Sequence, residues 1–263
     1  MLDRPRHYFS VYRSFVSCGF ATGLSFRVNF VLLIIMDLFF YASSLYATSF
    51  IFDQVDHIGP WNRSQFLFFV SFMLAVDQLH MTFIAEAFWG FSFDLRTGKL
   101  DFFLLKPIGT LFTVFFQHIR PSTLCNLPVP WILMFHYGRE AGLGTYDWAA
   151  LPFLVVLSLA LMVALEIVVA MAMFWTVESW GVNFLRMQLQ QVARWPEFIY
   201  TTWVKRLFTF VFPILLIGSA PVRFLLNGEI LPLVGLLAAL PLTCLAIRWL
   251  WGKGLKSYES ASS

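Results

Sequence analysis

The sequence predicts an all-α, polytopic membrane protein, and two observations carry that prediction. Of its 263 residues, 59% are hydrophobic and 13% are charged, with a mean hydropathy of +0.73. Soluble globular chains carry about 25% charged residues, and one core of this size does not hide so much apolar surface from water. The apolar residues also fall into stretches of about 20 or more, long enough for a helix to cross a hydrocarbon layer of about 30 Å. We therefore expect lipid to be the main solvent.

Candidate transmembrane helices use almost the whole length of the chain. Six are predicted, at about 28–52, 64–92, 109–136, 149–176, a less regular one within 181–226, and 230–251. This leaves no room for a separate soluble domain, so residues 1–263 are treated as one transmembrane domain.

Residues 1–22 precede the first span and have the pattern of an amphipathic helix. Apolar side chains share one face at helical spacing: Tyr8, Phe9, Tyr12, Phe15 and Val16. Arginines and serines fill the opposite face, which predicts a helix in the plane of the interface and not a cleaved signal peptide. The alternative is that this pattern continues the first span inward.

The distribution of lysine and arginine predicts the orientation in the membrane. Basic residues gather before the first span, after the second and after the last: Arg4, Arg6, Arg13, Arg27, Arg96, Lys99, Lys106, Arg248, Lys253 and Lys256. The loops 53–63 and 138–147 hold one arginine each and several acidic residues, so we place them outside. With an even number of spans, both termini face the cytoplasm of a plasma (inner) membrane.

The fifth span is ambiguous because residues 178–206 are too polar for a helix that faces lipid. The polar side chains are Glu178, Arg186, Gln188, Gln190, Gln191, Arg194, Glu197, Lys205 and Arg206. In one interpretation, 181–200 is a cytoplasmic amphipathic helix and 207–226 is the span. In the other, 181–195 is a short span buried against other helices, and 195–226 is a re-entrant pair broken near Pro213 and Pro221.

Motifs for catalysis and for metal or nucleotide binding were sought. The two Gly-Lys pairs, at 98–99 and 252–253, lack the earlier glycine of a P-loop, and the histidines and cysteines form no metal-spaced pair. Basic residues are spread over several loops without an aromatic-interleaved patch, which argues against nucleic acid as a partner. We expect no enzymatic activity, no cofactor and no metal site in this chain.

Several ionisable residues lie inside predicted spans, where each costs a few kcal/mol unless it faces protein or water. They are Asp37, Asp77, His80, Glu86, Arg120 and Glu166. One interpretation is a proton relay, in which Asp77 and His80 bond to each other across one helix face. The favoured one is a set of hydrogen bonds or salt bridges between helices.

Arg120 has a further interpretation, because three prolines follow it at 121, 128 and 130. They predict a kinked third span that borders a cavity, in which Arg120 contacts an anionic or amphiphilic substrate. A purely structural role for Arg120 is weighed equally.

Residues 94–107 form a short charged segment between two very hydrophobic stretches. It has a polar edge with Arg96, Lys99, Asp101 and Lys106, and it ends at Pro107. Its apolar edge contains Leu100, Phe103 and Leu104. This composition predicts a short helix lying against a membrane face.

The segment Gly98-Lys-Leu-Asp-Phe-Phe-Leu-Leu-Lys-Pro107 resembles the Gly-x-Leu-Asp-x-x-Leu-Leu-[Arg/Lys]-Pro signature of a branch of the type 2 ABC exporter permeases. Three other segments resemble the same branch: Phe174-Trp175, the stretch from Pro213 to Gly228, and the tail from Gly254 to Ser262. Lys106 stands where arginine is common, and Ser257 stands where a basic residue is usual.

The resemblance implies a six-span subunit with an interfacial N-terminal helix, a cytoplasmic coupling helix at 94–107, outer re-entrant helices within 195–226 and a cytoplasmic tail at 252–263. It therefore favours the re-entrant interpretation. It also implies two partners: a dimer of ATPase subunits and a second permease, similar or identical. The coupling residues would be Gly98, Lys99, Leu100, Asp101, Phe103, Leu104, Leu105, Lys106 and Pro107. Of these, the leucines and Phe103 would fill or buttress the ATPase groove, while Asp101 and Lys106 fix the register.

The predicted function is that of a transmembrane permease of an ABC exporter, moving a lipid-like or amphiphilic substrate. Candidate residues of the substrate pathway are Arg120, Asp37, Asp77, His80 and Glu166. Two alternatives stay open. One is an ion-coupled secondary transporter that uses Asp37, Asp77, His80 and Glu166 as its relay, and the other is a non-transporting membrane scaffold.

Overall fold

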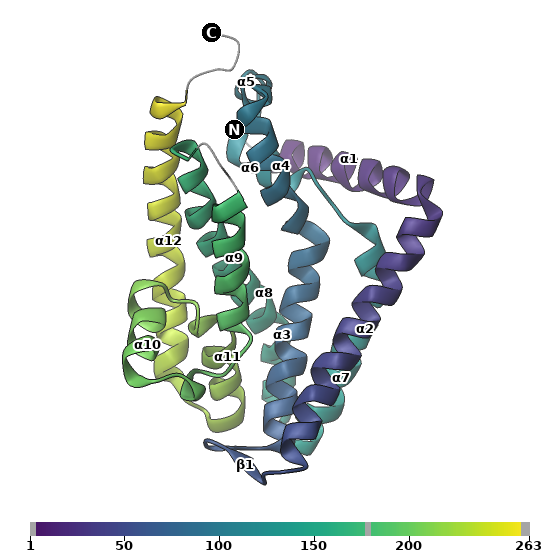
Figure 1. The fold of residues 1–263 in the computed structure, drawn as a ribbon, viewed down its shortest axis with the longest axis vertical. Helices are drawn as coiled ribbons and strands as arrows, with labels where there is room; N and C mark the ends of the chain where they lie inside the picture. Colours follow the sequence, from purple (N-terminus) through teal and green to yellow (C-terminus); the bar gives the residue numbers. More distant parts are fainter. Residues whose placement is uncertain (1–3, 177–179, 259–263) are drawn as a thin grey trace.

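Long helices run along the main axis of the molecule and pack side by side (Figure 1). The structure is a computed structural model that describes residues 4–176 and 180–258. A short hairpin of β1 (His57–Ile58) and β2 (Trp61–Asn62) lies at one end of the molecule, and the helix α5 (Lys99–Leu104) lies at the other. We refer to these as the hairpin end and the α5 end.

In the described part of the chain, four helical segments are long and apolar enough to cross a membrane. They are α2 (Arg27–Phe52), α3 (Arg63–Phe83) continued by α4 (Ala85–Arg96), α8 (Thr145–Ala170) continued by η2 (Met171–Phe174), and α12 (Ile230–Ser257). A bent pair adds a fifth if it is counted as one span. The protein is therefore an all-α polytopic membrane protein, as the composition predicted.

The helix α1 (Arg4–Ser25) runs across the α5 end and not along the bundle (Figure 1). The chain turns at Phe26, whose φ of −107° and ψ of 65° are not helical, so α1 and α2 are separate helices. Two contacts fix α1 to the bundle. The hydroxyl of Tyr8 accepts a hydrogen bond from the backbone N–H of Gly109 at 2.9 Å, and the Tyr8 ring meets Phe112 edge-on at 5.0 Å.

The expected third span is broken into three pieces: α6 (Thr110–Phe116), η1 (Pro121–Asn126) and α7 (Pro128–Glu140). The break is at Arg120, whose backbone is extended and whose N–H donates to the carbonyl of Thr82 at 2.9 Å. Proline has no N–H to continue a helix, which explains why new helical segments begin at Pro121 and Pro128. Because of these breaks, no single piece is long enough to cross a membrane alone.

The centre of the molecule is formed by α3 and α8. In their most apolar windows, 78% of the residues of the α3–α4 helix and 67% of those of the α8–η2 helix are buried, against 6% for α2 and 22% for α12. One apolar cluster lies towards the hairpin and includes Trp61, Phe69 and Leu161. The other lies around α4 and α5 and includes Phe91 and Phe103. The outer surfaces of α2 and α12 are left for lipid or for another chain.

The region after the fourth span contains several short elements. They are α9 (Trp180–Ala193), η3 (Glu197–Ile199), α10 (Thr202–Arg206), η4 (Leu207–Val211) and α11 (Leu216–Asn227). At about 1.5 Å per residue, α9 is about 21 Å long, less than the hydrocarbon thickness. The segments 202–211 and 216–227 are bent by 99° relative to each other, as in a broken span or a re-entrant loop. A continuous span over 207–226 is therefore not formed. Glu178 and the tail residues 259–262 of the predicted motifs lie outside the described residues.

Candidate functional site

The predicted coupling segment contains a short helix, α5, that a left-handed glycine sets at an angle to α4. Gly98 has a φ of +70°, and a Cβ would strain this conformation. The carbonyl of Gly98 then accepts a hydrogen bond from the N–H of Asp101 at 3.1 Å, which starts α5. Gly98 therefore determines where α5 points at the α5 end.

The apolar side chains of α5 divide between an inner and an outer face. Leu100 is fully buried and Phe103 is 3% exposed, and both pack in the cluster around α4 and α5. On the outer face, Phe102 is 68%, Leu104 42% and Leu105 84% exposed. Leu100 and Phe103 therefore buttress the helix from inside and leave the surface to the other three. Phe102 was not among the predicted coupling residues. The i, i+3 spacing of the two inner residues, Leu100 and Phe103, already places Phe102 on the outer face of α5.

The charged side chains of this segment hold α5 in place. Lys99 Nζ lies 3.2 Å from Oδ1 of the buried Asp94, and the ammonium groups of Lys99 and Lys106 lie 5.5 and 4.8 Å from the centre of the Phe103 ring. At the end of α12, burial raises the pKa of the Tyr258 phenol, and the nearby carboxylate of Asp101 raises it further. The result is an apolar knob that is fixed to the rest of the chain on its inner side.

The ionisable residues predicted inside the spans are distributed over three separate pairs or groups. The first pair joins α2 to the break in the third span: Arg120 Nη2 lies 3.2 Å from Asp37 Oδ1. Next to it, the amide of Asn126 donates to the carbonyl of Ile34 at 3.1 Å. A cavity of about 260 Å³ borders Arg120, as the prolines predicted, and Glu86 also lines it.

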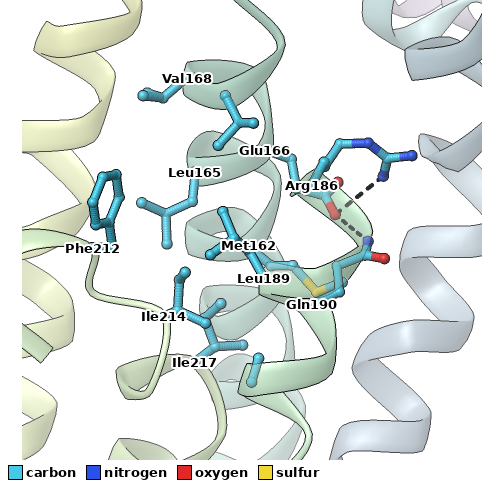
Figure 2. A pocket seen from close by; sticks show the side chains of 12 residues that line it. Met162, Leu165, Glu166, Val168, Arg186, Leu189, Gln190, Phe212, Ile214 and Ile217 are labelled. Carbon is cyan, nitrogen blue, oxygen red and sulfur yellow. Dashed lines mark hydrogen bonds and ion pairs between the residues drawn. The ribbon is translucent and has the colours of Figure 1, made fainter. Parts of the chain in front are cut away.

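The second group surrounds Glu166 of α8 (Figure 2). His80 Nε2 of α3 lies 2.6 Å from Glu166 Oε2, and Arg186 Nη1 of α9 lies 3.4 Å from Glu166 Oε1. Gln190, also of α9, donates to the same Oε1. The guanidinium of Arg186 lies 4.5 Å from the centre of the Phe88 ring. These contacts tie α3, α8 and α9 together in a buried site.

The third pair joins α3 to the end of α9, where Arg194 Nε donates to Asp77 Oδ2 at 2.8 Å. Asp77 and His80 therefore do not bond to each other, because each meets a residue of another helix. Arg186 and Arg194, the cationic partners of Glu166 and Asp77, were not identified from the sequence. The available signal was the spacing of Arg186, Gln190 and Arg194 at i, i+4 and i+8, which puts all three on one helix face.

A larger cavity of about 380 Å³ lies beside this third pair, between α2, α3 and the end of α9. Its lining consists of Phe40, Ser43, Ser44, Ala47, Thr48, Ile51, Val70, Met73, Leu74, Asp77, Gln191, Arg194 and Trp195. Apolar side chains make up most of the wall, with the Asp77–Arg194 pair as its charged part. Such a composition suits a ligand that has both an apolar and a polar portion.

The fold and these sites define a class of protein: a helical membrane protein that has charged pairs between its helices and an apolar knob at one end. The chain belongs to the ABC-2 family transporter proteins, whose sequence model matches residues 30–262. This confirms the resemblance to type 2 ABC permeases. No curated protein and no solved structure matches the chain.

Membership of this family makes the chain a permease subunit of an ABC transporter, which is a transport subunit and not a catalytic one. It also implies association with an ATPase subunit. The chain is therefore part of a larger complex.

Proposed function

We propose that this chain is one of two permeases in an ATP-driven exporter of a lipid-like or amphiphilic substrate, and that α5 receives the motion of separate ATPase subunits. The observation that carries this proposal is the outer face of α5. Phe102, Leu104 and Leu105 are exposed on a helix whose inner face is fully packed. A fixed apolar surface of this kind suits insertion into a groove of another protein.

In the proposed complex, the α5 end faces the cytoplasm of the plasma membrane. The basic residues near this end support that orientation, with Arg96, Lys99, Lys106 and Lys253 among them. The amphipathic α1 would lie in the plane of the inner interface, since it runs across the bundle at the same end.

The proposed topology has six spans, formed by α2, α3–α4, α6–α7, α8–η2, α9 and α12. The short α9 would span together with the chain that follows it, while α10, η4 and α11 form a re-entrant pair on the outer side. Support comes from the bend of 99° in this region and from the polar residues of α9, which meet Asp77 and Glu166 and not lipid.

A second permease, similar or identical, would complete the working unit. The long apolar face of α2, of which 6% of the most apolar window is buried, is available for this contact. ATP binding would close the ATPase dimer and move α5 together with α4 and α3. This movement would change the spaces beside α3, and the substrate would leave outward.

The test is a pair of substitutions on the exposed face of α5. Leu104→Asp and Leu105→Asp would place a carboxylate in the apolar contact, so we expect loss of co-purification with the ATPase subunit, and loss of substrate-stimulated ATP hydrolysis and transport. Tyr146→Asp is the matched control, because Tyr146 is 92% exposed in the first turn of α8, away from α5. Full coupling in both leucine variants would disprove the role of α5.

A further inference from the structure

The cavity between α2, α3 and the end of α9 has the size and composition of a ligand site. Its volume of about 380 Å³ lies within the range of about 300–1,000 Å³ that is usual for small-molecule pockets. Phe40 of α2, Met73 and Leu74 of α3, and Trp195 after α9 supply apolar parts of its wall. An occupant with an acyl or alkyl portion would replace water from this surface favourably.

The hydroxyl groups in the wall contribute little to selectivity for charge. Ser43 and Ser44 donate to the carbonyl of Phe40 at 2.9 and 2.8 Å, and Thr48 donates to the carbonyl of Ser44 at 2.9 Å. Their protons are therefore used within α2. Selectivity for one ligand headgroup over another must therefore come from the charged residues of the cavity.

Arg194 is the charge that is open to this cavity. Its side chain is 27% exposed, whereas that of its partner Asp77 is 8% exposed. The guanidinium group has five N–H donors, and Asp77 takes one of them, at Nε. The guanidinium also lies 5.0 Å from the centre of the Phe40 ring, which holds it at the wall of the cavity.

The contact that Arg194 makes is also a link between helices. It joins the end of α9 to α3, and α3 continues through α4 to the knob at α5. A ligand that draws Arg194 away from Asp77 would weaken this link. Since the pair is partly accessible, an incoming anion has a route to the guanidinium.

We propose that this cavity binds the anionic headgroup of an amphiphile, a phosphate or a carboxylate, and that the headgroup competes with Asp77 for Arg194 and so loosens α9 from α3. The inference rests on the proposed function, since it names the substrate class of the permease. It also makes a prediction of opposite sign for the two partners of one ion pair.

The experiment measures binding to the full chain in phosphatidylcholine nanodiscs, without ATPase subunits. The probe is a photoactivatable single-chain alkyl phosphate, with an alkyl trimethylammonium probe of equal chain length as the comparison. We expect Arg194→Gln to weaken binding of the alkyl phosphate about tenfold or more, because a charged hydrogen bond is lost. Arg194→Lys should retain most of it. Asp77→Asn should strengthen it, because the competing carboxylate is gone.

Arg63→Gln is the matched control, because Arg63 pairs with Asp53 at an exposed site away from the cavity. Size-exclusion profiles and thermal unfolding verify that each variant is folded. Equal weakening in Asp77→Asn and Arg194→Gln would show that the pair is only structural and would overturn the proposal. The proposal would also be overturned if Arg194→Gln weakened binding of the trimethylammonium probe as much as binding of the alkyl phosphate. Full competition by inorganic phosphate alone would overturn it as well. Because the assay contains no ATPase, its result does not depend on whether α5 contacts the ATPase, and the two proposals are tested separately.

Discussion

At the scale of single residues, the charged side chains inside the bundle are explained by their partners on other helices. The cost of an ionised group in a membrane was enough to select Asp37, Asp77, His80 and Glu166 from the sequence. It was not enough to pair them. Asp77 and His80 share a helix face, but that face meets Arg194, directly after α9, at one level and Glu166 of α8 at the next. The choice of partner depends on how the helices pack against one another. The spacing of residues along one helix does not determine this packing.

The first prediction concerns Glu166, which balances the charge of Arg186. Glu166→Gln would leave Arg186, 3% exposed, without a counter-charge, at a cost of about 3–5 kcal/mol in the free energy of unfolding. Unfolding of the purified protein in mixed micelles, followed by circular dichroism, measures this loss. Glu140→Gln is the control, since Glu140 pairs with His136 at an exposed site and should cost under about 1 kcal/mol. Equal stability of the two variants would contradict the structural role of Glu166.

The second prediction concerns the pH dependence of Glu229, which precedes α12. Hydrogen bonds from Arg223 and then Asn227 lower the pKa of its carboxyl group below the ordinary value of 4.5. A lowered folded pKa stabilises the fold above the unfolded pKa, and this stability is lost as the pH falls through the folded pKa. The side chain is 35% exposed, so the gain at pH 7 should be under about 1 kcal/mol.

The measurement for Glu229 is the difference in melting temperature between the protein and its Glu229→Gln variant. We expect a small positive difference near pH 7 that decreases as the pH falls below 4.5. A difference that stays constant over this range would show that ionisation of Glu229 has no part in it.

At the scale of elements, the segment 94–107 that was selected by its charges contains the end of α4 and the short helix α5, but the faces of α5 were not assigned from the sequence. The sequence predicted that the leucines and Phe103 would fill or buttress an ATPase groove, without saying which residue does which, and in the structure Leu100 and Phe103 pack inward. Composition alone does not separate the two faces when apolar residues occur on both sides. The break of the third span was easier to predict, since Pro121 and Pro128 cannot continue a helix by hydrogen bonding.

The third prediction tests whether Gly98 sets the direction of α5. Gly98→Ala would put a Cβ on a residue with a φ of +70°, at a cost of roughly 1–2 kcal/mol unless α5 moves. Movement of α5 would reduce affinity for the ATPase subunit by roughly tenfold if the strain is released there. Gly252→Ala is the matched control, because an added Cβ there, within α12, meets nothing within 4 Å. Unchanged affinity and unchanged melting temperature in Gly98→Ala would rule out this role.

At the scale of the whole molecule, the fold class followed from composition, but the arrangement of α9–α11 did not. The four basic residues Arg186, Arg194, Lys205 and Arg206 argued for a cytoplasmic helix over 181–200 when they were counted as free charges. In the structure, Arg186 and Arg194 are paired with acids of α8 and α3, so α9 packs against protein and not against lipid. A polar helix is tolerated at membrane depth when its partners are supplied by neighbouring helices. Those partners lie far away along the chain, where a local window of sequence does not include them.

The last prediction separates the two topologies by the side of the membrane on which residue 201 lies. In the proposed six-span topology, Thr201 lies in the outer re-entrant region. If 181–200 were a cytoplasmic helix instead, Thr201 would lie inside. The native cysteines at 18, 125 and 244 are exposed and are first replaced by serine. Thr201→Cys is then suitable for labelling, because Thr201 is itself exposed.

A membrane-impermeant maleimide should label Thr201→Cys in intact cells, in the same way as Glu140→Cys at the end of α7. Lys253→Cys, near the end of α12, should be labelled only after permeabilisation, because it lies at the α5 end that we place in the cytoplasm. Labelling of Thr201→Cys only after permeabilisation would overturn the re-entrant arrangement, while leaving the α5 proposal intact. Reversed behaviour at 140 and 253 would instead invert the whole molecule, and α5 would then be out of reach of any cytoplasmic ATPase.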